Sequence, residues 1–334
     1  MGGAGFIGSH LAEAVVQAGN RVLILDDLSI GSIDNVRGLK ESGRCEYWID
    51  SLMNRSLLVE LVDESDVVVH LAAAVGVRLI VESPVRTIDT NIRGTKAVLE
   101  AACKKKKLVF IASTSEVYGK ASQVPFSEED DVVLGASTRG RWSYAVSKLA
   151  DEFPALAYWK EKKLPVIVGR FFNTIGPRQT GRYGMVMPNF IAEALEGRPI
   201  TVFGTGKQSR CFCYVGDAVQ AIINLIQCPG ALGQVINIGN DEEISIKGLA
   251  HFVKKRTRSR SPIRYIPYRE AYEEGFEDMM RRVPSLEKLE ALTGFRPRVP
   301  LAEIVDCIVQ HIRDGATVRT ASQKMLVRRA FAGL

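Results

Sequence analysis

Histidine and closely spaced cysteine are scarce in this chain of 334 residues, which contains only four histidines and six cysteines. No two of the cysteines form a C-x-x-C pair. A zinc or redox centre needs such ligands at short, regular spacings, so the sequence predicts no metal site. Scattered, reduced thiols are typical of a cytoplasmic protein.

Long hydrophobic runs are also absent. No apolar stretch reaches the roughly 18 residues that a membrane span needs, and the N-terminus does not resemble a signal peptide, so we expect a cytoplasmic protein that does not enter a membrane. Aromatic residues make up 7% of the chain and are not interleaved with basic residues. We therefore expect no nucleic-acid partner, whereas the net charge of +6 suits a small anionic substrate.

Almost nothing precedes a glycine-rich segment at the start of the chain. Only Met1 stands before residues 2–10, which read GGAGFIGSH. Glycines at positions 2, 5 and 8 allow a tight turn and let the backbone approach a pyrophosphate without an intervening Cβ atom. A helix that begins after such a turn offers free N–H groups and the positive end of its dipole to the phosphates. The segment therefore predicts a dinucleotide site.

An acidic pair follows at a distance that suits a ribose ligand. Residues 21–25 read as a buried strand, and this strand ends at Asp26 and Asp27. A carboxylate about 20 residues beyond the glycines, at the end of a strand, is placed to bind the adenosine ribose 2′-hydroxyl. The same charge repels a 2′-phosphate, so the sequence favours NAD over NADP.

Strand-like and helix-like segments alternate through the first half of the chain. Buried strands are predicted at 66–71, 108–112 and 166–170, and helices at 84–102 and 142–160. This βαβ alternation predicts an α/β fold with a doubly wound parallel sheet of the Rossmann type.

The expected domains follow from where this alternation weakens. Residues 1–170 would form the NAD-binding domain, to which a late strand at 234–239 returns. Residues 171–314 would mainly form a smaller, mixed substrate-binding domain, and residues 315–334 a basic tail. Pro154 lies inside a predicted helix, where it removes a backbone donor and crowds the preceding turn, so we expect a kink there.

Tyr144 and Lys148 are four residues apart and so lie on one face of a helix. A tyrosine with a pKa near 10 is a poor base at neutral pH. A neighbouring ammonium group and the positive charge of an oxidised nicotinamide both favour its phenolate. Tyr144 is therefore a candidate base that removes a hydroxyl proton while a hydride leaves the same carbon.

With these features, the chain resembles the extended short-chain dehydrogenase/reductase family, which contains NAD-dependent nucleotide-sugar epimerases, dehydratases and decarboxylases. The resemblance runs from Gly2 to about Val305. The matching stretches are residues 2–10, 26–29, 70–73, 91–95, 113–119, 144–148, 176–179, 208–210 and 281–284.

The resemblance implies NAD as the cofactor and a UDP-sugar as the substrate. The NAD-binding residues that it implies are Gly2, Gly5, Phe6, Ile7, Gly8, Asp26, Asp27, Ser29, Asp50, Ser51, Leu71, Ala72, Ala73, Tyr144 and Lys148. The implied catalytic residues are Tyr144, Lys148, Thr114 and Glu116, and the implied substrate-binding residues are Thr114, Asn173, Arg182, Met187, Thr201, Arg210 and Arg282. Members of the family commonly form homodimers through the helices expected near 84–103 and 142–160, so a homodimer is implied as well.

Three features bear on the reaction that follows oxidation at the sugar C4. Glu116 is typical of dehydratases and decarboxylases rather than of plain hexose epimerases. The loop 179–185 resembles that of bacterial UDP-glucuronate 4-epimerases, and its Arg182 can pair with a sugar carboxylate. Residues 142–145 also resemble epimerases more than decarboxylases.

These features favour a 4-epimerase that interconverts UDP-glucuronate and UDP-galacturonate through a 4-keto intermediate. The alternative is a UDP-glucuronate decarboxylase that forms UDP-xylose, followed by a UDP-glucose 4-epimerase or a 4,6-dehydratase. A non-catalytic protein that binds NAD or a nucleotide sugar is a minor alternative, because such relatives usually lack the tyrosine or the lysine present here.

The strand that should lead into the glycine segment has no residues to form it, so we expect the first strand of the sheet to be truncated. Relatives place about 5–6 residues there, and the loss would leave two neighbouring strands with unpaired edges. Adding an apolar strand ahead of Met1 is therefore expected to raise both the melting temperature and the affinity for NAD, measured by thermal unfolding and by titration. An extension that changes neither would mean that the sheet closes in another way.

Overall fold

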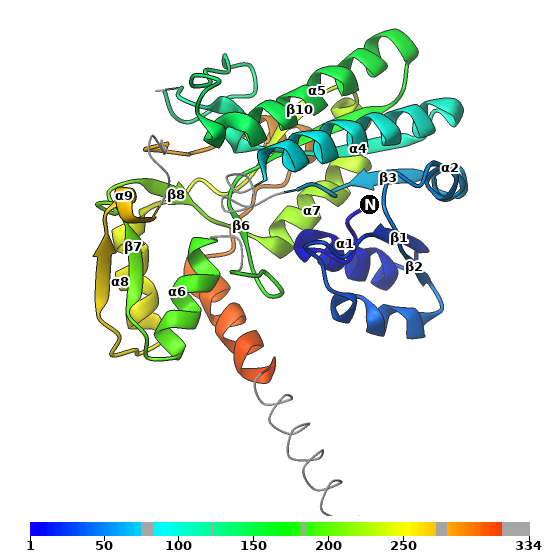
Figure 1. Cartoon of the computed structure of the whole chain (residues 1–334). Coiled ribbons are helices and arrows are strands. Elements are labelled where there is room, and N and C mark those ends of the chain that lie inside the picture. Colours follow the sequence, from blue (N-terminus) through cyan, green and yellow to red (C-terminus); the bar gives the residue numbers. More distant parts are fainter. Residues whose placement is uncertain (75–82, 122, 182–184, 272–278, 316–334) are drawn as a thin grey trace, which may run out of the picture.

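A four-stranded parallel sheet with the order β10-β5-β4-β3 forms the centre of the structure (Figure 1). Its strands are β3 (Val67–His70), β4 (Leu108–Thr114), β5 (Val166–Phe171) and β10 (Val235–Ile238). The computed structural model describes residues 1–74, 83–121, 123–181, 185–271 and 279–315. The late strand β10 pairs with β5, as the sequence predicted for 234–239.

Alternate residues of the central strands are buried on opposite faces of this sheet. Val109 and Ile111 of β4 belong to one hydrophobic core, and Phe110 between them belongs to another. A parallel sheet that is covered on both faces needs such continuous apolar strands. The covering helices are α4 (Pro84–Lys105) and α5 (Ser143–Lys162) on one face, and α1 (Phe6–Gln17) and α7 (Val215–Ile226) on the other (Figure 1).

A second, two-stranded parallel sheet stands beside the glycine segment and contains one strand that was not predicted, β2. The remaining elements of this half are β1 (Val22–Asp26), β2 (Cys45–Ile49), α2 (Arg55–Glu64) and the 3-10 turns η1 (Ile33–Asn35), η2 (Arg37–Ser42), η3 (Ser115–Tyr118) and η4 (Gly140–Trp142).

Met1 and Gly2 lie between β1 and β3 and hydrogen-bond to both sides. The Met1 amino group donates to the Val69 carbonyl at 3.0 Å. The Leu71 N–H donates to the Met1 carbonyl at 3.0 Å, and the Gly2 N–H donates to the Leu25 carbonyl at 2.9 Å. These two residues therefore occupy, over their short length, the position between the two sheets where the sequence places a strand.

The second half of the chain forms three small sheets and the helices that pack on them. The pairs are β7 with β12, β8 with β11 and β6 with β9. Residues 301–315 are also helical. The elements are β6 (Thr174–Ile175), α6 (Val186–Leu195), β7 (Ile200–Phe203), β8 (Ser209–Cys211), β9 (Cys213–Tyr214), η5 (Pro229–Ala231), β11 (Glu243–Ser245), α8 (Ile246–Arg256), β12 (Ile263–Ile266), α9 (Tyr268–Ala271) and α10 (Glu287–Thr293).

This half has a hydrophobic core of its own, to which α6, β7 and α8 contribute Phe190, Val202 and Leu249. A separate core fits the predicted substrate-binding domain, although the boundary at residue 170 stays a prediction. The α/β class and the parallel Rossmann-type sheet are confirmed.

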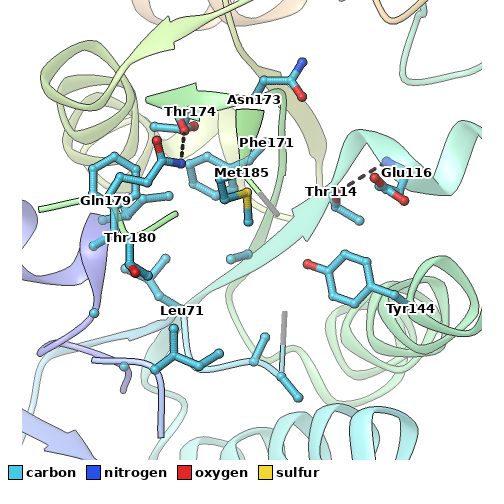
Figure 2. Close-up of a pocket in the computed structure, with 18 of the residues that line it drawn as sticks. Leu71, Thr114, Glu116, Tyr144, Phe171, Asn173, Thr174, Gln179, Thr180 and Met185 are labelled. Carbon is cyan, nitrogen blue, oxygen red and sulfur yellow. Dashed lines mark hydrogen bonds between the residues drawn. The ribbon is translucent and has the colours of Figure 1, made fainter. Parts of the chain in front are cut away.

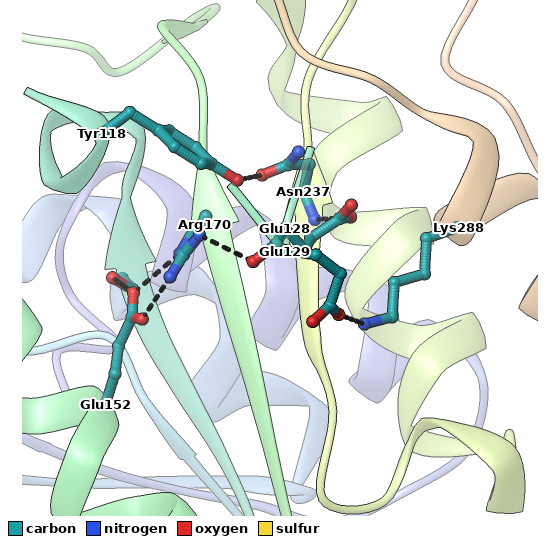
Figure 3. Close-up of polar contacts among 8 residues, drawn as sticks. Tyr118, Glu128, Glu129, Glu152, Arg170, Asn237 and Lys288 are labelled. Atoms are coloured by element: carbon teal, nitrogen blue, oxygen red, sulfur yellow. Dashed lines mark hydrogen bonds and ion pairs between the residues drawn. The ribbon is translucent and has the colours of Figure 1, made fainter. Parts of the chain in front are cut away.

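A buried ion pair holds α5 against the central sheet. Arg170 of β5 donates from Nε and Nη2 to the two carboxylate oxygens of Glu152 on α5, at 3.0 and 2.8 Å (Figure 3). Ser113 of β4 donates to the same carboxylate. Both charged side chains are at most 6% exposed. Breaking such a pair leaves an uncompensated buried charge, which costs about 3–5 kcal/mol, so the position of α5 is strongly fixed.

A second polar group joins β10 to the segment that follows η3. The Tyr118 hydroxyl donates to the Asn237 side-chain oxygen at 2.8 Å, and the Asn237 N–H donates to the Glu128 carboxylate at 2.8 Å (Figure 3). Lys288, on α10, pairs with Glu129 at 3.3 Å. These contacts tie β10 and α10 to residues of the segment 118–129.

Three remaining sequence-based expectations concern local features. Helix α5 continues through Pro154, so the proline does not end it, and the kink stays a prediction. All six cysteines are free thiols, and within the described ranges no cluster of three potential metal ligands is present. None of the helices in the described part of the chain has the length and hydropathy of a membrane span.

Candidate active site

One cavity of about 860 Å³ contains the predicted site residues. The predicted cofactor residues line it from the glycine segment, the ends of β1 to β3 and helix α5. The predicted substrate residues line it from the end of β4 and from the second half of the chain (Figure 2). Every residue proposed above as catalytic, cofactor-binding or substrate-binding is among them, apart from Arg182, which lies outside the described residues.

The glycine segment approaches its surroundings too closely for side chains. Gly2 has φ +75°, and a Cβ atom there would lie 2.6 Å from the Ala72 nitrogen. A Cβ atom on Gly8 would lie 2.1 Å from the Gly2 carbonyl oxygen. Gly5 caps α1 without a side-chain hydrogen bond, and the first turn carries no acidic residue. The N–H groups of this turn are therefore available to an anion such as a pyrophosphate.

Asp26 lines the cavity and also hydrogen-bonds to the glycine segment. Its two carboxylate oxygens accept from the N–H groups of Ala4 and Leu28, each at 2.9 Å. Two carboxylate oxygens offer about four acceptor sites, so the group retains capacity for the ribose hydroxyls. The same arrangement recurs at Asp50, where hydrogen bonds from Asn54 and Ser51 lower the pKa of the carboxyl group.

Tyr144 and Lys148 project from α5, opposite the end of β4. The Tyr144 hydroxyl points toward Thr114 and Glu116 (Figure 2). Tyr144 is 8% exposed. Burial, followed by the negative charges of Glu116 and Asp151, raises the pKa of Tyr144, whereas a hydrogen bond with Thr114 lowers it. Tyr144 of α5 and Thr114 of β4 therefore lie close enough for one sugar hydroxyl to contact both.

Glu116 is held as an anion by two arginines. Arg141 Nη1 donates to one carboxylate oxygen at 2.5 Å, and Arg282 Nη1 donates to the other at 2.9 Å. The three side chains are between 7% and 13% exposed. Burial acts to raise the pKa of Glu116, but the charges of Arg141 and Arg282 outweigh it and bring the pKa down to about 2. Arg282 is therefore part of a buried cluster and not of a surface ion pair.

The other predicted substrate residues are held by backbone contacts. Arg210 Nη1 donates to the Met279 carbonyl at 2.8 Å, and the Asn173 side-chain amide donates to the Cys211 carbonyl at 3.0 Å. Thr201 lies on β7. Met187, on α6, is fully buried in the core beneath them.

Two charged residues at this site were missed in the sequence. Arg141 lies three residues before Tyr144, directly ahead of the predicted helix 142–160. Asp151 contacts Lys148 from the next turn of α5. A basic residue shortly before the tyrosine and an acidic one shortly after the lysine are weak signals alone, because charged residues are common on helices.

A dinucleotide cradle that opens onto a helix with a tyrosine and a lysine is the arrangement of NAD-dependent short-chain dehydrogenases/reductases, and the structure belongs to this class. Residues 1–308 match the model of the family described as GDP-mannose 4,6 dehydratase, and the chain is a member of that family. The family comprises nucleotide-sugar epimerases, dehydratases and decarboxylases that use NAD.

Three similar proteins indicate which reactions occur on this fold. A UDP-N-acetyl-alpha-D-glucosaminuronate decarboxylase of Bacillus cytotoxicus is 42% identical, over 94% of this chain and 96% of its own length. UDP-glucuronic acid decarboxylase 1 of Danio rerio is 34% identical, over 93% and 71%. The solved structure of a UDP-glucuronic acid 4-epimerase from Bacillus cereus, in complex with UDP-glucuronic acid and NAD, is 28% identical over 94% and 98%, with a TM-score of 0.84.

The close approach at Gly8 generates a prediction. In Gly8→Ala the new methyl group must displace α1 from the glycine segment, so the N–H groups that face the pyrophosphate move. We expect the affinity for NAD to fall at least tenfold, or by about 1.4 kcal/mol, measured by calorimetric titration. Gly38→Ala is the matched control, because no atom lies within 4 Å of a Cβ atom there. Unchanged NAD binding by Gly8→Ala would contradict the assignment.

Proposed function

We propose that the chain is an NAD-dependent decarboxylase of a UDP-hexuronate, acting through a 4-keto intermediate. The observation that carries the proposal is the buried anion of Glu116, which lines the cavity beside Thr114 and Tyr144. Two relatives at 42% and 34% identity, which are named as decarboxylases of UDP-sugar acids, support it.

The charge of the cavity wall suits a substrate with both a diphosphate and a carboxylate. Among the residues that the structure describes, the cations Arg141, Arg210 and Arg282 stand against the carboxylate of Glu116 at this end of the cavity. The excess positive charge attracts an anionic substrate. Arginine also provides the planar, two-pronged donor that suits phosphate and carboxylate oxygens.

The first part of the reaction falls to Tyr144 and Thr114. When bound, NAD supplies the acceptor for the hydride that leaves the sugar C4. Tyr144, as a phenolate, takes the proton of the C4 hydroxyl, and Thr114 hydrogen-bonds to the same oxygen. The new C4 ketone lies β to the C6 carboxylate, so the C5–C6 bond can break with its electron pair delocalised onto O4. Tyr144, now neutral, and Thr114 donate to the enolate oxygen.

We place the C6 carboxylate of the substrate against the Glu116 carboxylate, so that repulsion between the two groups favours the loss of CO2. Repulsion between two carboxylates raises the free energy of the ionised substrate, and this repulsion disappears when the group leaves as neutral CO2. C5 then takes a proton from solvent, the hydride returns to C4, and Tyr144 returns its proton to O4. One proton is consumed, one CO2 is formed, and the sugar becomes a UDP-pentose without net oxidation.

The 4-epimerase favoured by the sequence is the second candidate. It is supported by the similar epimerase structure that contains UDP-glucuronic acid and NAD. An epimerase must return the hydride before CO2 is lost, so it has to keep the carboxylate in place next to the ketone. The charge of Glu116 works against this, which is why we place decarboxylation first.

Product analysis tests the two candidates directly. Purified protein is incubated with NAD and with UDP-glucuronate or UDP-N-acetylglucosaminuronate labelled at C6. We expect labelled CO2 and a UDP-pentose, detected by gas trapping and by NMR. Formation of the C4 epimer with the label retained would overturn the decarboxylase in favour of the epimerase. No turnover of either donor would refute both.

The role of Glu116 has its own test. Glu116→Gln keeps the shape and one acceptor oxygen but removes the charge, so we expect CO2 release to fall about a hundredfold, the size of effect seen when one preorganised charge or donor is lost. Glu64→Gln, at an exposed ion pair with Arg21, is the matched control and should leave the rate unchanged. Equal rates for Glu116→Gln and the wild type would remove the main support for decarboxylation.

We also propose that the protein is a homodimer that associates through α4 and α5. Val146 and Phe153 are seven residues apart on one face of α5 and are 45% and 66% exposed, and Val85 on the neighbouring α4 is 80% exposed. The two helices lie side by side on one face of the sheet (Figure 1). Large apolar side chains in such a group are typical of a surface that a second copy covers.

Phe153→Asp tests this surface. A charge at its centre is expected to convert the dimer to monomer, measured by light scattering after size-exclusion chromatography. Ile49→Asp, at an exposed position on β2, is the control and should leave the mass unchanged. A wild-type protein that is monomeric at all concentrations would exclude the dimer.

A further inference from the structure

A buried carboxylate lies behind the predicted base and takes no part in the chemistry above. Asp151 is seven residues beyond Tyr144, on the same face of α5. Its side chain is 0% exposed, and Oδ2 accepts from Lys148 Nζ at 2.7 Å. Lys148 itself is 3% exposed at the side chain and lines the cavity. The lysine that should promote ionisation of Tyr144 therefore carries its own counter-ion.

In the described part of the chain, the other ionisable side chains next to this pair are neutral or already paired. His70 of β3 shares a hydrogen bond of 3.1 Å with Thr95 of α4. Burial, together with the positive charges of Lys148 and of the Met1 amino group, lowers the pKa of His70 well below its usual value, so the ring is uncharged at neutral pH.

On the remaining sides, the carboxylates are held by arginines. Glu152, next in the chain, is bound to Arg170. Glu116, beyond Tyr144, is bound to Arg141 and Arg282. Asp151 is therefore the carboxylate that pairs with Lys148, and its negative charge also acts on Tyr144, whose pKa it raises.

We propose that Asp151 is a positioning residue, which fixes the Lys148 ammonium group and offsets its charge so that Tyr144 can both accept and return a proton within one turnover. The inference rests on the proposed function, in which C4 is oxidised and later reduced. Tyr144 takes the C4-hydroxyl proton in the first half and gives it back to O4 in the second. A lysine without a counter-ion would favour the phenolate throughout, which helps the first transfer and hinders the second.

Asp151→Asn tests the charge while keeping the shape of the side chain. Loss of the negative charge should make Tyr144 ionise more readily, so the acid limb of the pH profile of kcat should move to lower pH by about one unit. Because the proton is then returned more slowly, reduced cofactor and the 4-keto sugar should accumulate during turnover. The first is followed by the absorbance of reduced nicotinamide, and the second by trapping with borodeuteride and mass spectrometry.

Two further variants separate charge from packing. Asp151→Glu keeps the charge and adds one methylene group, so it should restore the wild-type pH profile even if it lowers the melting temperature. Asp63→Asn removes a carboxylate that pairs with Lys105 at the surface. It should change neither the pH profile of kcat nor the accumulation of reduced cofactor. Asp151 is a packing residue, and the proposal is wrong, if Asp151→Asn changes neither the pH profile of kcat nor the amount of reduced cofactor, whereas Asp151→Glu lowers the activity and the melting temperature more than Asp151→Asn does.

A substrate-free measurement keeps this test distinct from that of the proposed function. The phenolate absorbance of Tyr144 is titrated in the NAD complex, with Tyr144→Phe subtracted. Asp151→Asn should ionise at lower pH than the wild type, whether or not a UDP-hexuronate is turned over. An unchanged or higher ionisation midpoint would refute the role of Asp151 even if CO2 release is observed. A lowered midpoint with no turnover would refute the proposed function and leave the charge effect on Tyr144 standing.

Discussion

The buried ion pair between Glu152 and Arg170 decides how α5 sits on the central sheet, and the site depends on that placement. Arg170 belongs to β5, and Ser113 of β4 donates to the same carboxylate. Both strands end at the cavity, so the contact fixes the helix at the height of their carboxyl ends. Tyr144, two turns earlier on α5, is thereby brought opposite Thr114, the last residue of β4. One structural contact thus helps to set the distance between Tyr144, the proposed base, and Thr114, which we propose binds the same substrate oxygen.

The pairing of buried charges is the second constraint on this cavity. Each buried carboxylate near Tyr144 has a cationic partner: Glu116 has two arginines, and Asp151 has Lys148. Removing charges from water is costly, and pairing is what makes their burial tolerable. The pairs also have chemical consequences, because they place a carboxylate bound by two arginines on one side of Tyr144 and a balanced lysine–aspartate pair on the other. The proposed decarboxylation and the proposed role of Asp151 both follow from this distribution.

Local sequence patterns were sufficient to predict the strands of the central sheet. β3, β4 and β5 consist mostly of apolar, often β-branched residues, which is what strands buried on both faces of a parallel sheet need. Gly2 and Gly8 mark the proposed phosphate-binding turn, because a Cβ atom at either position would come too close to neighbouring backbone atoms. β2 escaped notice because it includes the charged Glu46 and only Cys45 of its five residues is buried, so its pairing with β1 decides its structure. The location of Met1 between two strands is likewise set by hydrogen bonds to residues far along the chain.

The sequence by itself was enough to determine the sheet type and to propose the cofactor-binding turn and the tyrosine–lysine helix, because each depends on residues that are near one another in the chain. Only the tertiary structure decided that Arg282 reaches Glu116, across 166 positions, and that Arg141 binds the opposite oxygen of the same carboxylate. A charged residue in a sequence does not specify its partner, since the partner is selected by which elements pack together. The electrostatics that favour one reaction over another within this family therefore arise only on folding.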